Sequence, residues 1–184
     1  MPSAPSRVVA VFGGSEAAPE SPEYRDAREV GRLLAAAGCV VINGGYGGVM
    51  EASARGAREA GGSTIGVTTR AFARRGSANR FIVTEHRETD LFDRTRRLIE
   101  SASAFIILPG KSGTLAELAF LWALIRAGLL GARPIVLLGT VWEGLLRELE
   151  TRGLVGGPEI AATRIARGPG EAVELVLLSP QGSR

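Results

Sequence analysis

Short apolar runs alternate with longer amphipathic stretches along almost the whole chain, and this alternation most constrains its fold. The first apolar runs lie at residues 7–12, 39–43 and 63–68, and the stretches 21–38 and 48–62 between them have helical periodicity. Strands that alternate with helices are typical of parallel sheets built from βαβ units. We therefore expect an α/β fold whose sheet is mainly parallel.

The same pattern continues towards the C-terminus. Apolar runs at 81–86, 104–109 and 133–139 alternate with amphipathic stretches at 91–103, 114–128 and 142–153, and two further segments follow at 159–166 and 170–178. The runs "CVVI", "FIIL" and "PIVLL" are apolar throughout, which suits central strands that helices cover on both faces. The expected architecture is a Rossmann-like, doubly wound sheet with helices on both faces.

The length of 184 residues favours one domain over residues 1–184, with flexible tails at 1–6 and 180–184. The single cysteine, Cys39, lies in an apolar run and is expected to be a buried small hydrophobe in a reducing compartment. No basic N-terminal region precedes an apolar core, and no apolar run approaches the roughly 18 residues of a membrane span. We expect a cytoplasmic protein with no membrane association.

The basic residues are unevenly distributed. The formal net charge is +3, and Lys111 is the only lysine among 22 basic residues. Residues 70–97 hold eight arginines against four acids, a local excess that favours an anionic ligand, although a solvated arginine-rich surface is the alternative. The segment does not interleave aromatic residues with its basic ones for base stacking, so we expect no nucleic-acid partner.

Three glycine-rich loops follow three of the expected strands. They contain Gly13, Gly14 and Ser15; then Gly44, Gly45, Gly47 and Gly48; then Gly110, Lys111, Ser112, Gly113 and Thr114. Ligands of doubly wound sheets bind at the carboxyl ends of the strands, where glycine lets backbone N–H groups approach a phosphate at a helix N-terminus. The loops predict a phosphate or nucleotide site, and a tight strand-to-helix turn is the alternative for each glycine taken alone.

Two common nucleotide motifs are excluded. A triphosphate-binding loop reads GxxxxGK[ST], and the glycine that should precede "GKS" is replaced by Phe105. A dinucleotide site reads GxGxxG after the first strand and has an acid at the end of the second, where this chain has Asn43. The site is therefore not expected to bind a nucleoside triphosphate in a P-loop, NAD or FAD.

An acid and an arginine lie near the third loop in the sequence. Glu117 follows Thr114 by three residues, so it is either a chemical group beside the loop or the acid of a capping box with Thr114 as the cap. Glu51 has a similar position after the second loop. Arg94 precedes the strand that leads into the third loop, and of Arg94, Arg96 and Arg97 at most one or two can face inwards on a helix.

These residues carry a family resemblance. "LPGKSGTLAEL" resembles the PGGxGTxxE motif of the LOG ("Lonely guy") family, "NGGYGGVMEASARGAREAGGSTIGV" is similar to its second glycine-rich segment, and "RTRRLIESASAFIILPG" matches its arginine-containing helix. The resemblance spans roughly residues 8–142. Two positions depart from the family pattern: Lys111 replaces the second glycine of PGG, and Thr95 replaces the lysine that usually follows the arginine.

The resemblance implies hydrolysis of the N-glycosidic bond of an AMP-type nucleoside 5′-monophosphate, such as a cytokinin nucleotide, to free base and ribose 5-phosphate. It assigns Glu117 and Arg94 as catalytic residues and the glycine loops, with Glu51, as nucleotide-binding. No metal or cofactor is implied, and His86, the only histidine, is expected at the surface of a strand end. Lysine decarboxylation, another activity proposed for the family, is disfavoured because Lys111 lies in a loop shaped for phosphate.

Two further expectations come from the resemblance. A non-catalytic nucleotide or molybdenum-cofactor carrier is the alternative function, and the presence of both Arg94 and Glu117 favours the enzyme. A homodimer is implied, and residues 118–130, "LAFLWALIRAGLL", are apolar enough to serve as its interface, with simple core burial as the alternative.

Overall fold

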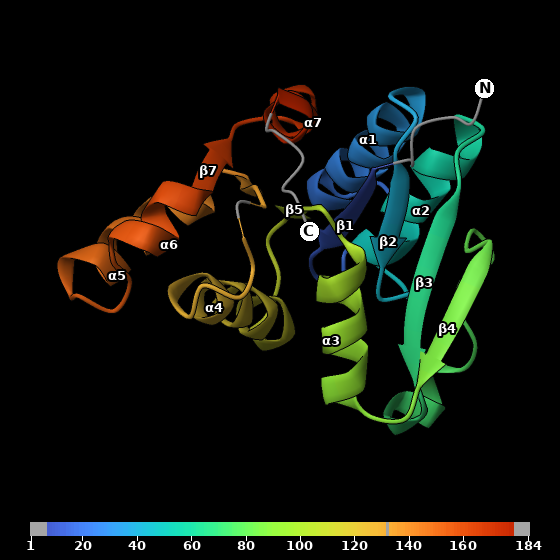
Figure 1. Ribbon diagram of the computed structural model, residues 1–184. Coiled ribbons are helices and arrows are strands. Elements are labelled where there is room, and N and C mark those ends of the chain that lie inside the picture. The colour runs from blue at the N-terminus through green and yellow to red at the C-terminus, as the bar shows by residue number, and fades with distance from the viewer. Residues whose placement is uncertain (1–6, 132, 179–184) are drawn as a thin grey trace, which may run out of the picture.

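The computed structural model describes residues 7–131 and 133–178, so the expected tails at 1–6 and 180–184 lie outside the described residues. A seven-stranded sheet with the order β4-β3-β2-β1-β5-β6-β7 forms the centre, and all of its pairings are parallel (Figure 1). The strands are β1 (Val8–Phe12), β2 (Val40–Asn43), β3 (Thr64–Thr69), β4 (Thr84–Glu88), β5 (Ala104–Ile107), β6 (Ile135–Leu138) and β7 (Thr163–Ala166). The expected α/β, doubly wound class is confirmed.

Helices connect the strands. They are α1 (Pro22–Ala36), α2 (Val49–Glu59), the 3-10 helix η1 (Arg70–Arg75), α3 (Leu91–Ser101), α4 (Ser112–Arg126), α5 (Val141–Thr151), α6 (Gly157–Ala162) and α7 (Pro169–Leu178). Capping chemistry defines several starts: the Ser21 side chain accepts from the Tyr24 N–H at α1, and Asp90 accepts from the Asp93 N–H at α3. These bonds satisfy N–H groups that the first turn of a helix leaves without a partner.

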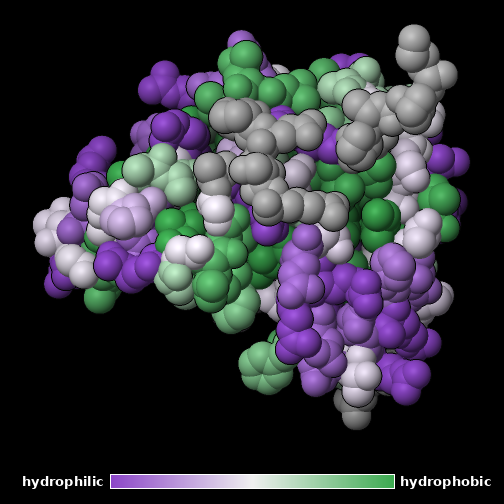
Figure 2. Space-filling view, viewed as in Figure 1, coloured by the Kyte–Doolittle hydropathy of each residue, from purple (hydrophilic) through white to green (hydrophobic). Residues whose placement is uncertain are grey.

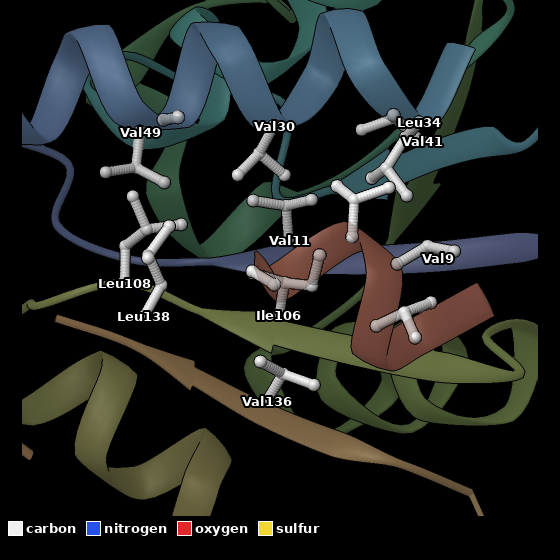
Figure 3. Packing of buried hydrophobic residues seen from close by; sticks show 14 of the residues in the cluster. Val9, Val11, Val30, Leu34, Val41, Val49, Ile106, Leu108, Val136 and Leu138 are labelled. Atoms are coloured by element: carbon white, nitrogen blue, oxygen red, sulfur yellow. The ribbon is translucent and has the colours of Figure 1, made fainter. Parts of the chain in front are cut away.

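Two apolar layers cover the sheet because neighbouring strand residues point to opposite faces. Val9 and Val11 of β1 pack with α1, α2 and α7, whereas Ala10 and Phe12 pack with α3, α4 and α5. Figure 3 shows the first layer, in which Val30 of α1 points towards the β1 and β5 side chains. Both faces of the central strands are thus buried, which explains their continuous apolar sequences.

Helices α1 and α2 approach each other at their backbones. A Cβ atom at Gly31 would lie 1.9 Å from the Ser53 carbonyl oxygen, and a Cβ at Gly56 would lie 1.8 Å from the Arg28 carbonyl oxygen. The two glycines therefore face the opposite helix reciprocally. Only residues without a side chain permit this crossing.

Two segments differ from the sequence-based expectation. Residues 81–83, expected within a strand, form a turn because the Asn79 side chain accepts from the Phe81 N–H and its carbonyl accepts from the Ile82 N–H, so β4 begins only at Thr84. The segment 159–166 divides into the end of α6 and strand β7, at Thr163.

The direction of the chain across the sheet reverses between β1 and β5. Strands β2, β3 and β4 lie on one side of β1, whereas β5, β6 and β7 follow on the other (Figure 1). The connections after β1 and β5 therefore run to helices on opposite faces, which opens a crevice at their carboxyl ends. The first and third glycine loops begin there.

Candidate active site at the carboxyl edge of the sheet

The three glycine loops meet through backbone contacts. The Gly14 N–H donates to the Pro109 carbonyl at 3.1 Å, and its own carbonyl accepts from the Val49 N–H at 3.0 Å. A Cβ at Gly13 would lie 2.7 Å from the Val49 side chain. Gly48 has φ +64, and a Cβ there would lie 2.3 Å from the Gly14 oxygen. Glycine is needed here because three loops share one small volume.

Asn43 holds the second loop in shape. Its buried amide nitrogen donates to the Met50 carbonyl at 2.8 Å and to the Ser53 hydroxyl at 3.1 Å, and its amide oxygen accepts from the Gly45 N–H at 2.9 Å. Asn43, which stands where a dinucleotide-binding motif has an acid, therefore has a structural role in the second loop. An asparagine that ends a strand before two glycines is the sequence signal for such a turn.

Arg94 is buried in the first turn of α3, with 6 % of its surface exposed. Its Nε donates to the Val67 carbonyl at 2.8 Å, and its guanidinium carbon lies 5.8 Å from the Tyr46 ring centre and 5.9 Å from that of Phe72. A Cβ at Gly44 would lie 1.8 Å from its Nη2, so this glycine makes room for the guanidinium. A backbone carbonyl and two aromatic rings thus fix the cation.

The other two arginines of this helix lie at the surface. Arg96 pairs with Asp93 at 3.1 Å, and Arg97 pairs with Glu88 of β4. Of the three candidates only Arg94 faces inwards, as helical spacing allows. Thr95, at the second departure from the family pattern, donates its hydroxyl to the Leu91 carbonyl at 2.9 Å.

Glu117 of α4 faces Arg94. Its Oε1 lies 3.9 Å from Arg94 Nη1, and only 16 % of the Glu117 side chain is exposed. Burial raises the pKa of Glu117 to about 7, and the opposing effect of the Arg94 guanidinium is smaller. An acid that titrates near neutral pH in a buried position can both accept and donate a proton at physiological pH.

The start of α4 differs from the expected capping box. The N-cap residue is Lys111, without a side-chain cap bond, and Thr114 is a buried residue inside the first turn. Glu117 consequently lies in the second turn and is not the acid of a box capped by Thr114. The threonine packs against Gly110, where a Cβ would lie 2.2 Å from the Thr114 hydroxyl oxygen.

Lys111 fits the loop without strain. Its φ of −88 and ψ of −160 are extended backbone angles that any residue adopts, so the glycine of the family pattern is not required there. Ser112 and Gly113 are exposed, and nothing lies within 4 Å of a Cβ at Gly113. The N–H groups of this first turn have no intrahelical acceptors and form an open N-terminus suited to an anion.

A cleft of about 470 Å³ adjoins the first two loops. It is lined by Ser15, Glu16, Tyr46, Gly47, Ser77 and Asn79. The Asn79 amide donates to the Tyr46 carbonyl at 2.8 Å, which fixes Asn79 to the second loop. Sequence reasoning identified Ser15 and Gly47 but missed Glu16, Tyr46, Ser77 and Asn79. Tyr46 lies between flanking glycines, whereas Ser77 and Asn79 carry no local signal.

Glu51, a predicted nucleotide-binding residue, contacts helix α1. Its Oε1 accepts from the Tyr24 hydroxyl at 3.2 Å, which joins the first turns of α2 and α1. Burial is the main cause that raises the pKa of Tyr24, and the Glu51 charge adds to it. The structure thus connects Glu51 to α1.

The described part of the chain has neither a cluster of metal-binding side chains nor a membrane-spanning helix. Residues 7–131 and 133–178 contain no group of three or more His, Cys, Asp and Glu side chains arranged for a metal ion. No helix within these ranges is both long and apolar enough to cross a bilayer. His86, expected at the surface of a strand end, instead lies half-buried in the middle of β4. Cys39 is buried, as expected, and burial raises the pKa of its thiol.

Comparison with known proteins identifies the family. Residues 6–151 match the SLOG cluster4 family, a LOG-like group, and this segment is most of the chain. The chain belongs to the SLOG cluster4 family. The matched segment contains β1 to α5 and therefore all three glycine loops, Arg94 and Glu117.

The relatives of this SLOG protein include named enzymes and named cofactor-binding proteins. A cytokinin riboside 5′-monophosphate phosphoribohydrolase of Mycobacterium marinum is 37% identical over 112 residues, which cover 58% of this chain and 58% of that protein. The molybdenum cofactor binding protein of Rippkaea orientalis has a TM-score of 0.74 at 25% identity and covers 94% of this chain and 96% of its own.

The molybdenum cofactor carrier protein of Chlamydomonas reinhardtii has a TM-score of 0.73 at 25% identity, over 94% of the SLOG chain and 96% of the carrier. The SLOG chain thus spans little more than half of the mycobacterial enzyme and nearly all of each molybdenum-cofactor protein. The name of the enzyme refers to a nucleoside monophosphate, and the names of the other two proteins refer to the molybdenum cofactor.

Proposed function

We propose that this SLOG protein is a phosphoribohydrolase that cleaves the N-glycosidic bond of an AMP-type nucleoside 5′-monophosphate. The observation that carries the proposal is the buried pair of Glu117 and Arg94, 3.9 Å apart, beside the open N-terminus of α4. The similarity to the mycobacterial phosphoribohydrolase supports it. A carrier needs phosphate-binding loops but has no need for a buried acid with a pKa near 7.

The proposed reaction adds water across one bond. Water attacks C1′ of the ribose, the bond from C1′ to the base nitrogen breaks, and the base leaves with a proton, which gives free base and ribose 5-phosphate. Cleavage of this kind passes through an oxocarbenium-like state, which a carboxylate stabilises electrostatically. Glu117 accepts the proton of the attacking water and returns a proton to the leaving base.

The other residues position the nucleotide. The backbone N–H groups of Ser112, Gly113 and Thr114 bind the 5′-phosphate at the N-terminus of α4. Arg94 holds the Glu117 carboxylate and orients the base. Fixing the phosphate places C1′ relative to Glu117 and so lowers the entropic part of the barrier.

A cofactor carrier is the second candidate, favoured by the high coverage of the Rippkaea orientalis and Chlamydomonas reinhardtii structures. Incubation with AMP and with an N6-substituted AMP, followed by chromatographic detection of free base and ribose 5-phosphate, separates the two functions. Release of either base supports the enzyme and shows the N6 preference. Tight binding of a phosphorylated ligand with no product would instead favour the carrier.

Gly44→Ala is expected to lower the hydrolysis rate by about 10²-fold while the protein stays folded. The added Cβ would lie 1.8 Å from Arg94 Nη2 and 2.6 Å from the Met50 sulfur, and both are far ends of flexible side chains that can move away. The guanidinium would then leave Glu117. Gly168→Ala is the control, since Gly168 follows β7 and has open space around its Cβ position. Equal rates in both variants would contradict the role of Arg94.

We also propose that the protein forms a homodimer through α4. Leu118, Leu121 and Trp122 of this helix are buried in the core, so its other face is available. That face presents Leu115 and Phe120, which are 43% and 48% exposed, and Figure 2 shows apolar residues gathered over α4. Exposed apolar surface of this kind marks association sites.

Sedimentation is expected to give a dimeric mass for the wild type and a monomeric mass for Phe120→Lys, because a charge in the interface has no partner. Leu154→Lys, at a residue that is 69% exposed in the loop after α5, should leave the mass unchanged. A monomeric wild type would disprove the dimer.

A further inference from the structure

The only lysine of the chain forms an ion pair across two of the glycine loops. Lys111 Nζ contacts Glu16 Oε2, which joins the loop before α4 to the loop after β1. Both side chains are exposed, at 76% and 70%. The loops already contact through the Gly14 and Pro109 backbones, so the ion pair lies on a rim whose backbone is fixed independently.

The acid and the lysine of this ion pair occupy different positions at the site. Glu16 is among the cleft-lining residues, whereas Lys111 is the N-cap of α4, directly before the N–H groups proposed to bind phosphate. A carboxylate in this position repels an anionic ligand, and the ammonium offsets that repulsion. Ion pairs at such exposure contribute little to stability, so a phosphate can replace Glu16 as the partner of Lys111 at low cost.

We propose that Lys111 and Glu16 together determine specificity for phosphorylated ligands. Lys111 exchanges Glu16 for the 5′-phosphate when a nucleotide binds, and Glu16 disfavours anions that do not reach the lysine. The charge at position 111 therefore compensates for the acid at position 16. This inference rests on the proposed function in taking a nucleoside 5′-monophosphate as the ligand and the N-terminus of α4 as its phosphate site.

Calorimetric binding of AMP and adenosine to four proteins tests the pair: wild type, Lys111→Met, Glu16→Gln and the double variant. Methionine keeps an unbranched side chain out to the Cε position of lysine and removes the ammonium charge. Lys111→Met is expected to weaken AMP binding about tenfold and to leave adenosine binding unchanged. Glu16→Gln should tighten AMP binding, and the double variant should bind AMP more tightly than Lys111→Met.

Arg152→Met is the matched control, because it removes one positive charge from an exposed ion pair with Glu148 at the far end of α5. It should not change the affinity for AMP. If Lys111→Met binds AMP as the wild type does, or loses AMP and adenosine affinity equally, the inference is wrong. Additive effects of the two substitutions would also overturn it, because they would show that the charges act independently.

Product release by the wild type is measured in the same samples. Phosphate-dependent binding without free adenine would disprove the enzymatic function on AMP and keep the inference about Lys111. Adenine release by the wild type, together with an AMP affinity of Lys111→Met equal to that of the wild type, would support the enzymatic function and disprove the inference about Lys111. A wild type that binds AMP no more tightly than adenosine would overturn the specificity inference directly.

Discussion

Glu117→Gln is expected to lower kcat by about 10²–10⁴-fold, the range for loss of a general acid–base group, while AMP still binds. Glutamine fills the same volume but accepts no proton from water. In the wild type, burial raises the pKa of Glu117 to about 7, so the carboxylate required as base is lost as the pH falls through this value. The wild-type kcat/KM should therefore decrease below about pH 7, and the residual rate of the variant should lack this decrease.

Glu100→Gln, which alters an exposed acid of α3, provides the control and should match the wild type. Thermal unfolding separates loss of chemistry from loss of fold. Ionised Glu117 is disfavoured by burial, so at pH 8 the wild type carries a destabilising charge that Glu117→Gln lacks, and the variant should unfold at the same or a higher temperature. A fully active Glu117→Gln enzyme would remove Glu117 from the mechanism.

Gly31→Ala is expected to destabilise the fold by roughly 3 kcal/mol, at the upper end of overpacking effects. Its Cβ would lie 1.9 Å from the Ser53 carbonyl oxygen and 2.8 Å from the carbonyl carbon. These are backbone atoms of α2, so relief requires the two helices to separate. In a chain of this length the melting temperature should fall by about 6–12 °C.

Gly144→Ala tests whether the destabilisation comes from the contact between α1 and α2 and not from replacing a helical glycine by alanine in general. Gly144 lies inside α5 with nothing within 4 Å of its Cβ position, and alanine is the better helix former by about 0.5–1 kcal/mol. Its melting temperature should stay equal or rise. If calorimetry gives the same melting temperature for Gly31→Ala as for the wild type, the two helices are not in the close contact described.

The fold was predictable because its central strands are buried on both faces and therefore read as apolar runs. Predictions were less accurate at the sheet edge. Residues 81–83 have apolar side chains, yet the Asn79 turn keeps them out of β4. Local apolar character could not reveal a turn that a polar side chain two residues earlier imposes.

The candidate site was predictable in part. Arg94 and Glu117 were noticed near the third loop and assigned by the family resemblance, and the structure brings them to 3.9 Å. The role of Thr114 as a helix cap was wrong because α4 begins at Ser112, two residues earlier. The contact of Lys111 with Glu16 joins positions 95 residues apart, and no local pattern encodes it.

Strand β4 limits how the sheet can associate. It ends one side of the sheet and carries Glu85, Arg87 and Glu88 in a five-residue segment, and Figure 2 shows a hydrophilic surface over it. Adding a strand there would strip water from these charges, a cost by which edge strands resist aggregation. A crowded solution of this protein therefore has a polar barrier against sheet extension at β4.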